Sequence, residues 1–305
     1  MKTAFLFPGQ GSQSVGMLAS LAGETVVRQT FQEASGALDF DLGQLIAEGP
    51  EEQLNRTDNT QPALLASGVA LWRLWEQRGG QRPDFLAGHS LGEYTALVCA
   101  GVLSLGDGVR LVAERGRLMQ QAVPVGSGAM AAILGLDDDQ VRAACAEAAQ
   151  GEVVEAVNFN APGQVVIAGA STAVERAIAA CKAAGAKRAL PLPVSVPSHC
   201  ALMRPAAERL ADVLDTMTLH QPELPVINNV DVTAATDSSH IRDALVRQLY
   251  SPVRWVETVA WLAGQGVSQA CECGPGKVLA GLVKRIDRNI TVVALEQPDS
   301  FPALK

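Results

Sequence analysis

The sequence predicts an α/β protein, with a mainly parallel sheet in one large domain and a smaller domain inserted into it. Strand patterns are followed by glycine-containing loops and by segments with helical spacing of apolar residues, an order typical of parallel sheets. The order of the expected elements then changes in the middle of the chain. Aromatic residues make up only 4% of the 305 residues, and the abundant Ala, Leu and Val suit helices packed on a buried sheet.

The first strand and a long helix are marked by start and stop signals. Residues 3–7 form an apolar run that predicts a short buried strand, and residues 61–77 carry apolar side chains at helical spacing. Thr60 stands where an N-cap belongs, Pro62 lies in the first turn and Gly79 follows the last turn. A helix over 61–77 is therefore expected.

A second strand leads directly into a tight glycine turn. Residues 85–87 are apolar and run into Gly88-His89-Ser90-Leu91-Gly92, after which residues 91–102 and 108–122 show helical spacing. Strand, turn and helix in this succession indicate a βα unit of a mainly parallel sheet.

The segment 126–193 has a different rhythm. Asp137 with Gln140 and Thr172 with Glu175 have the spacing of capping boxes, which predicts two helix starts. The expected elements are a strand at 129–134, a helix to 149, strands at 153–158 and 164–168, a helix to 185 and a strand at 187–192. Because β-α-β-β-α-β is the order of a ferredoxin-like unit, we expect a ferredoxin-like small domain.

The large domain is expected to comprise residues 1–125 and 194–305, with the small domain inserted between them. After Pro197 the expected elements are a helix at 204–217 and short strands at 225–228, 270–272 and 291–295.

Composition and charge exclude several classes of protein. With 48% hydrophobic and 18% charged residues, the chain has the composition of a folded globular protein. The net charge of -8 argues against nucleic-acid binding, which needs Lys and Arg to neutralise phosphates. No stretch approaches the ~18–20 apolar residues of a membrane span, and the apolar start is too short for a signal peptide. We expect a cytoplasmic protein with no nucleic-acid or membrane partner.

The six cysteines do not have the spacing of a metal site. Cys271 and Cys273 are the only close pair, and no second pair of Cys or His follows at zinc spacing. We therefore expect reduced, mostly buried thiols and no metal.

Residues 88–92 match G-x-S-x-G, the nucleophile elbow. A serine at a tight turn between strand and helix takes a strained backbone, which only small neighbours allow. The turn would expose the hydroxyl of Ser90 above the start of the next helix, with the N–H of Leu91 facing a developing oxyanion. The pattern predicts a catalytic serine, and a plain tight turn is the alternative.

A serine nucleophile needs a base, and the chain has four histidines. His89 adjoins the serine and is expected to be structural, while His220 and His240 lie in polar surroundings typical of the surface. His199 remains as the candidate base, against a structural role. No Asp or Glu stands out as the third member, so a backbone carbonyl or an amide side chain could orient His199.

Six short motifs follow one another along nearly the whole chain. They are Pro8-Gly9-Gln10-Gly11-Ser12-Gln13, Gly88-His89-Ser90-Leu91-Gly92-Glu93-Tyr94, Glu114-Arg115-Gly116-Arg117, Val157-Asn158-Phe159-Asn160, Pro197-Ser198-His199 and Gly274-Pro275-Gly276. Together they resemble the malonyl-CoA:acyl-carrier-protein transacylases, the stand-alone acyltransferases of bacterial fatty-acid synthesis. The resemblance implies an α/β-hydrolase-like core beside the ferredoxin-like domain. It also implies malonyl-CoA as substrate, no cofactor, and acyl carrier protein as partner.

The resemblance also implies a role for each of eight residues. Ser90 is the nucleophile and His199 its base, and the N–H groups of Gln10 and Leu91 form the oxyanion hole. Arg115 pairs with the free malonyl carboxylate, Gln248 orients His199, and Asn160 and Gln61 lie near the pocket. Taken from the residues alone, Arg115 would instead be a solvated arginine on a helix.

Two basic clusters could dock an acidic carrier protein. They consist of Lys182, Lys187 and Arg188, and of Lys277, Lys284, Arg285 and Arg288. Either could also be an ordinary solvated face.

Three other classes of protein could have the same serine elbow. A serine esterase or thioesterase would pass the acyl group to water, a non-catalytic binding subunit would keep only the fold, and a transacylase subunit of a malonate decarboxylase would use another carrier. The Pro-Gly-Gln-Gly loop and a buried arginine argue against the first, and retention of both Ser90 and His199 argues against the second.

Overall fold

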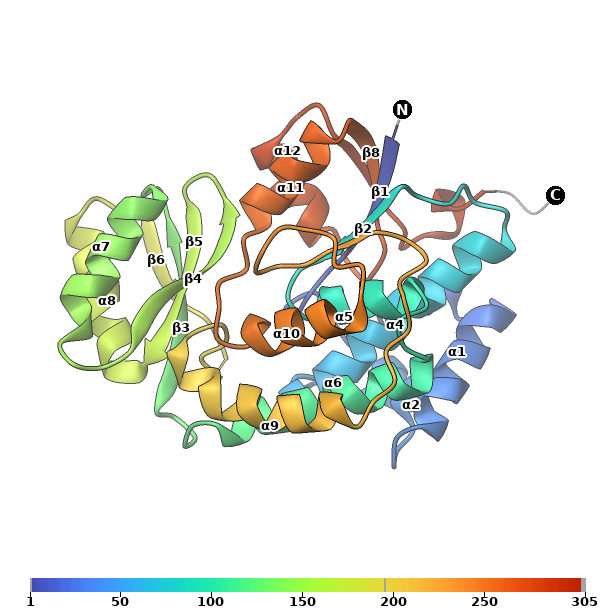
Figure 1. Cartoon of the computed structure of the whole chain (residues 1–305), viewed down its shortest axis with the longest axis horizontal. Coiled ribbons are helices and arrows are strands. Elements are labelled where there is room, and N and C mark those ends of the chain that lie inside the picture. Colours follow the sequence, from blue (N-terminus) through green and yellow to red (C-terminus); the bar gives the residue numbers. More distant parts are fainter. Residues whose placement is uncertain (1, 195, 303–305) are drawn as a thin grey trace.

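The computed structural model describes residues 2–194 and 196–302, which form two lobes with one sheet each (Figure 1). The sheet of the large lobe has five strands in the order β7-β2-β1-β8-β9, and all neighbouring strands run parallel. These strands are β1 (Lys2–Phe7), β2 (Phe85–Gly88), β7 (Val226–Ile227), β8 (Val267–Glu272) and β9 (Thr291–Ala294). The expected mixed α/β class with a parallel sheet is confirmed.

Both faces of the parallel sheet are buried. Because successive side chains of a strand point to opposite faces, each strand contributes to two apolar clusters. Phe5 and Phe7 of β1 join one apolar cluster, whereas Ala4 and Leu6 join another. The first cluster takes side chains from α1 (Thr25–Gly36), α2 (Leu42–Glu48), α3 (Glu51–Leu54), α4 (Thr57–Gln77), α5 (Leu91–Cys99), α6 (Leu105–Gln121), α9 (Arg204–Asp215) and α10 (Ser238–Gln248). The second takes them from α11 (Trp255–Gly264) and α12 (Val278–Ile286).

Helix α4 begins one turn earlier than expected. Its N-cap is Arg56, not Thr60, whose N–H already donates to the carbonyl of Arg56 at 2.7 Å. Pro62 lies inside this helix, where it lacks an N–H for the carbonyl four residues earlier, and the turn before it is nevertheless helical. The far end is as expected, because Gly79 follows it with φ +70°.

The small lobe contains a four-stranded antiparallel sheet in the order β4-β5-β3-β6. In chain order its elements are β3 (Gly128–Leu134), α7 (Asp138–Ala149), β4 (Val154–Ala161), β5 (Gln164–Ala170), α8 (Ser171–Ala183) and β6 (Arg188–Pro191). Both helices pack on one face of the sheet and form a separate apolar core. Figure 1 shows this lobe beside the large one, in green to yellow.

One of the two expected capping boxes is present. Asp137 and Gln140 bond reciprocally at the start of α7. The second prediction is wrong, because α8 begins after Ala170, which offers no side-chain cap. The hydroxyl of Thr172 instead donates to the carboxylate of Glu152, which lies across the lobe and competes successfully with the local cap.

The two lobes are joined by main-chain hydrogen bonds. The N–H of Val253 donates to Val157 of β4 at 2.8 Å, and the N–H of Phe159 donates back to Val253 at 3.0 Å. Cys200 packs against the second face of the small sheet, beside Met130. These contacts bring β4 and the segment around residue 199 to the carboxyl end of β2. Every helix in residues 2–194 and 196–302 is too short or too polar to cross a membrane.

Candidate active site

Ser90 occupies a strained turn between β2 and α5. Its backbone has φ 53° and ψ -109°, a conformation that costs a non-glycine residue about 1–3 kcal/mol. A Cβ on Gly88 would lie 1.9 Å from the carbonyl carbon of Gly92, and a Cβ on Gly92 would lie 1.9 Å from the carbonyl oxygen of Phe7. Both glycines of the motif are therefore required by close backbone approach.

His199 reaches Ser90 from the return segment, 109 residues further along the chain. Its Nε2 lies 2.7 Å from the hydroxyl oxygen of Ser90. Its Nδ1 lies 2.7 Å from the main-chain oxygen of Gln248, which can only accept, so Nδ1 carries the proton and Nε2 is free to accept. Gln248 does contact His199 as expected, but through its backbone carbonyl and not through its side-chain amide.

The surroundings of His199 keep its imidazole neutral. Burial, and next the positive charge of Arg115, lower the pKa of His199 to about 3. The side chain is 2% exposed. A neutral imidazole with a free Nε2 is the form that can accept a proton from a serine hydroxyl.

Arg115 is a buried cation, so a solvated position on α6 is excluded. It is 1% exposed, and its Nη1 donates to Gln61 at 2.9 Å. Its Nη2 donates to the side-chain oxygen of Gln248 at 3.0 Å and lies 3.3 Å from the hydroxyl of Ser90. Within the described part of the chain no carboxylate lies within 4.0 Å of it, and its Nε has no partner. Two amides, the hydroxyl of Ser90 and the ring of Tyr94, whose centroid is 5.1 Å from the guanidinium carbon, surround the charge, which leaves a demand for an anion.

A cavity of about 120 Å³ lies above Ser90. Gln10, Leu91, Arg115 and His199 line it together with Ser90. In residues 2–194 and 196–302, the main-chain N–H groups of Gln10 and Leu91 have no hydrogen-bond partner. Two unpartnered donors beside a nucleophilic oxygen can hold an oxyanion.

The other expected site residues lie one layer further back. Gln61 and Gln248 hold Arg115 in place and do not line the cavity. Asn160 also lies outside the lining, and its side-chain oxygen is 2.8 Å from Nε2 of His89. His89 itself lines the cavity, and Asn160 thereby holds its imidazole in place.

Three polar residues of the site were not found by sequence reasoning. Asn158 lines the cavity, and its buried side-chain oxygen has no partner among the described residues. Its position two residues before Asn160 on a strand is a signal that could have identified it. Glu93 and Asn229 lie beneath Ser90, and the signal for Glu93 is a charged residue in an otherwise apolar first turn. Asn229 carries no such signal.

A neutral histidine that accepts from a serine at a glycine elbow, beside free N–H donors, is the site of an α/β enzyme that transfers acyl groups. A family model described as acyl transferase domain matches residues 4–293. The malonyl CoA-acyl carrier protein transacylase of Salmonella typhimurium is 62% identical over 301 residues, covering 98% of this chain and 97% of the relative. The chain belongs to the acyl transferase family and, within it, to the malonyl CoA-acyl carrier protein transacylases.

Solved structures agree with this membership along the whole chain. An acyl carrier protein S-malonyltransferase from Vibrio cholerae has a TM-score of 0.97 and 61% identity, with full coverage of both chains. A malonyl-transacylase in complex with a type II PKS acyl-carrier protein has a TM-score of 0.97 and 59% identity, covering 98% of this chain and 97% of that one.

Proposed function

We propose that this protein transfers a malonyl group from malonyl-CoA to the phosphopantetheine thiol of an acyl carrier protein, through an acyl-serine intermediate on Ser90, in fatty-acid biosynthesis. One observation carries the proposal: the hydroxyl of Ser90 lies 2.7 Å from Nε2 of a neutral His199 and 3.3 Å from the guanidinium of Arg115. Nucleophile, base and an unpaired cation thus meet at one cavity. The names of the relatives support the choice of acyl group and acceptor.

The first half-reaction forms the acyl-serine. His199 takes the hydroxyl proton as the Ser90 oxygen attacks the thioester carbonyl, and it returns that proton to the sulfur of the departing coenzyme A. The N–H groups of Gln10 and Leu91 hold the oxyanion, and removal of one such donor typically lowers kcat by about 10²–10³. In the second half-reaction the carrier thiol gives its proton to His199 and attacks the acyl-serine, which restores the Ser90 hydroxyl.

Arg115 selects the acyl group in this proposal. A guanidinium binds a carboxylate through two parallel hydrogen bonds, and here it has no carboxylate of the described chain to pair with. The free carboxylate of a malonyl group on Ser90 supplies that charge, whereas an acetyl group does not. Gln61 and Gln248 fix the plane of the guanidinium, and Asn160 holds the imidazole of His89 at the edge of the cavity.

The docking surface for the carrier combines parts of the two basic clusters. Lys187 and Arg188 from the first cluster and Arg285 from the second line one cavity of about 510 Å³, called here the basic cavity. Arg285 also bonds to Gln164 at the tip of the small lobe. Cations gathered in a concave surface attract an acidic partner more strongly than scattered ones, despite the net charge of -8.

The architecture proposed with this function is an α/β-hydrolase-like core of residues 1–125 and 194–305 and a ferredoxin-like domain of residues 126–193. The parallel sheet with a serine elbow after β2 supports the first, and the order β-α-β-β-α-β supports the second. The cysteines of the described chain are free thiols, which favours a cytoplasmic location. We propose that catalysis needs no cofactor.

The mass of the intact protein after brief mixing with malonyl-CoA tests the function. We expect one malonyl adduct that is absent in Ser90→Ala and absent with acetyl-CoA, and that disappears when carrier protein is added. Free malonate without an adduct would favour a thioesterase. An adduct that no fatty-acid carrier accepts would favour a malonate decarboxylase subunit, and no reaction at all would favour a binding subunit.

A further inference from the structure

A buried polar network lies directly beneath Ser90 and is separate from the groups that contact the substrate. Asn229, two residues after β7, is 1% exposed, and Glu93, in the first turn of α5, is 2% exposed. Both side chains are polar in an apolar interior, where leaving a buried polar group without a partner typically costs about 1–3 kcal/mol. Their side chains bond to the backbone of the elbow, to the main-chain N–H of Asn229 itself and to the side-chain amide of Gln248, which also binds Arg115.

The side-chain amide of Asn229 forms hydrogen bonds with the main chain on both sides of His89. Its side-chain oxygen accepts from the N–H of Ser90 at 2.7 Å, and its side-chain nitrogen donates to the carbonyl of Gly88 at 2.7 Å. Strands β2 and β7 pair in parallel as far as Ala87 and Ile227, where β7 ends. The amide of Asn229 therefore continues the ladder beyond the last strand pair, at the point where the backbone must turn into its strained conformation.

Glu93 connects Asn229 to Gln248. Its Oε2 accepts from the main-chain N–H of Asn229 at 2.8 Å and from the side-chain nitrogen of Gln248 at 2.9 Å. The same nitrogen of Gln248 also donates to the carbonyl of Ser90 at 3.1 Å. Burial raises the pKa of Glu93 to about 7, and because both bonds go to Oε2, a proton on Oε1 leaves them in place.

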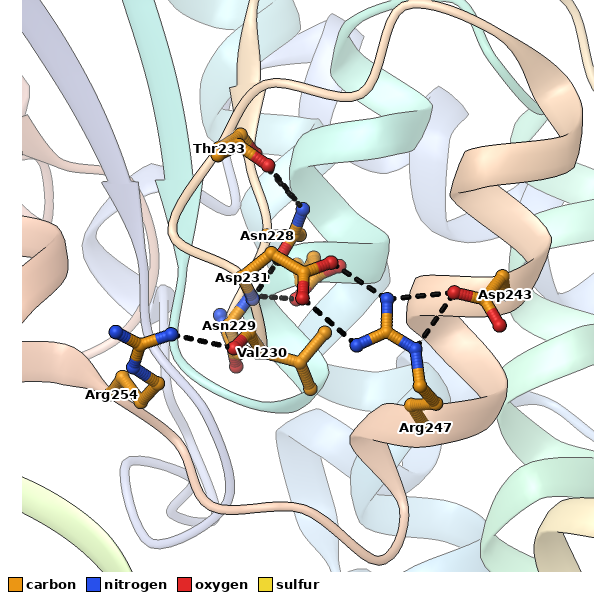
Figure 2. A network of polar contacts seen from close by, with 9 residues as sticks. Asn228, Asn229, Val230, Asp231, Thr233, Asp243, Arg247 and Arg254 are labelled. Atoms are coloured by element: carbon orange, nitrogen blue, oxygen red, sulfur yellow. Dashed lines mark hydrogen bonds and ion pairs between the residues drawn. The ribbon is translucent and has the colours of Figure 1, made fainter.

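The loop that carries Asn229 is itself clamped to α10. Figure 2 shows the guanidinium of Arg247 between Asp231 and Asp243, with two bonds to Asp231 at 2.7 and 2.9 Å. Arg254 donates to the carbonyl of Val230 at 2.9 Å from the other side. Since Gln248 follows Arg247 on α10, one helix end fixes both the loop and the amide that reaches Ser90.

We propose that Asn229 and Glu93 are positioning residues of acyl transfer: Asn229 holds the backbone of Ser90 so that its hydroxyl faces His199, and Glu93 holds Asn229 and Gln248 in register with it. The proposal rests on the proposed role of Ser90 as nucleophile. Neither residue touches substrate. A displacement of Ser90 by about 1 Å would lower the rate about 10²-fold, because attack requires the hydroxyl oxygen about 3–3.5 Å from the carbonyl carbon with the reacting orbitals aligned.

The test compares Asn229→Ala with Asn228→Ala, a matched control in the same loop. Among residues 2–194 and 196–302, the side chain of Asn228 bonds only within the loop, to Thr233 and Asp231, so its loss loosens the loop without releasing Ser90 (Figure 2). The readouts are the single-turnover rate of Ser90 acylation at saturating malonyl-CoA, the KM, the thermal midpoint, and the rate of labelling by a fluorophosphonate, a serine-directed reagent. For Asn229→Ala we expect acylation and labelling to fall about 10²-fold, with KM changed less than about threefold. Asn228→Ala should lower both rates no more than several-fold, at a similar loss of thermal midpoint.

A second pair of variants tests the hydrogen-bond geometry of Glu93. Glu93→Gln keeps an acceptor oxygen for both donors, so it should retain most of the acylation rate, whereas Glu93→Ala should lose it. Equal rates for Asn229→Ala and Asn228→Ala, or an equal fall for Glu93→Gln and Glu93→Ala, would overturn the proposal. If Asn229→Ala does not fold, Asn229→Leu, which removes both side-chain bonds and still fills the space of the asparagine, replaces it in the comparison. If the wild type accepts no malonyl group, the proposed function fails, while the labelling rates still decide the positioning role.

Discussion

Nδ1 of His199 donates to the main-chain carbonyl of Gln248 at 2.7 Å, so the group that orients the base is part of the backbone. A carbonyl fixes the tautomer of the imidazole without adding a negative charge next to it. The side chain at position 248 is then free for Arg115, Glu93 and the carbonyl of Ser90.

A first prediction concerns this division of labour at position 248. Gln248→Ala keeps the backbone carbonyl, so the labelling rate of Ser90 by a fluorophosphonate should fall far less than in His199→Ala. The KM for malonyl-CoA should rise, because Arg115 loses one of its two amide supports. Equal labelling rates in the two variants would show that the carbonyl does not orient the base.

The pH dependence of acylation follows from the lowered pKa of His199. A base whose pKa lies near 3 stays neutral as the pH falls through 6.5, so the labelling rate should be flat between about pH 5 and pH 8. In Arg115→Gln a cause of the lowering is removed, and any acid limb should move to higher pH. A wild-type acid limb centred near pH 6.5 would contradict the prediction.

Arg115 should discriminate between acyl groups. Arg115→Ala should lower kcat/KM for malonyl-CoA by about 10²-fold or more, the scale on which a bidentate charged contact is lost, and should change acetyl-CoA turnover much less. Arg117→Ala is the matched control on the same helix, since Arg117 pairs with Glu114 and lies outside the cavity lining. Parallel losses for both substrates would remove Arg115 from substrate selection.

The basic cavity should determine carrier binding. Lys187→Glu combined with Arg285→Glu should raise the KM for the carrier several-fold and leave that for malonyl-CoA unchanged, and the effect should shrink at high salt. Lys182→Glu changes the net charge of the same lobe outside the cavity and should have little effect. Lys182→Glu reverses one charge and the double variant reverses two. If Lys182→Glu raises the KM for the carrier as much per reversed charge as the double variant does, the net charge of the lobe sets the affinity and the basic cavity does not.

The clamp on the loop of Asn229 should matter more than an ordinary surface ion pair. Arg247→Ala breaks a network with Asp231 and Asp243 and should reduce the acylation rate several-fold, with a loss of about 1 kcal/mol in the free energy of unfolding. Arg110→Ala removes a single exposed pair with Asp107 and should change neither measurably. Unfolding in denaturant together with single-turnover acylation gives both quantities.

Local patterns in the sequence were enough to predict the elbow. The two glycines that flank Ser90 are needed by contacts within a few residues and one neighbouring strand. The period of apolar residues identified the strands and helices α4 to α9, whereas α1, α2, α3, α10, α11 and α12 were not predicted. The same local patterns also produced an error. The spacing of Thr172 and Glu175 predicts a helix cap, but the hydroxyl of Thr172 donates to Glu152, 20 residues earlier in the chain. Periodicity does not include such competition from distant side chains.

By itself the sequence determined the α/β class, the strained serine turn and the candidate base, because residue types and spacing carry that information. Tertiary structure alone decided that His199 meets Ser90, that a main-chain carbonyl orients it and that Arg115 is buried without a carboxylate. Every residue has a main-chain carbonyl, so the sequence does not indicate which carbonyl will orient the base. The burial of Arg115 depends on the side chains that other elements pack against it. For the same reason Asn229, which holds the nucleophile, could not be found until β7 was placed beside β2.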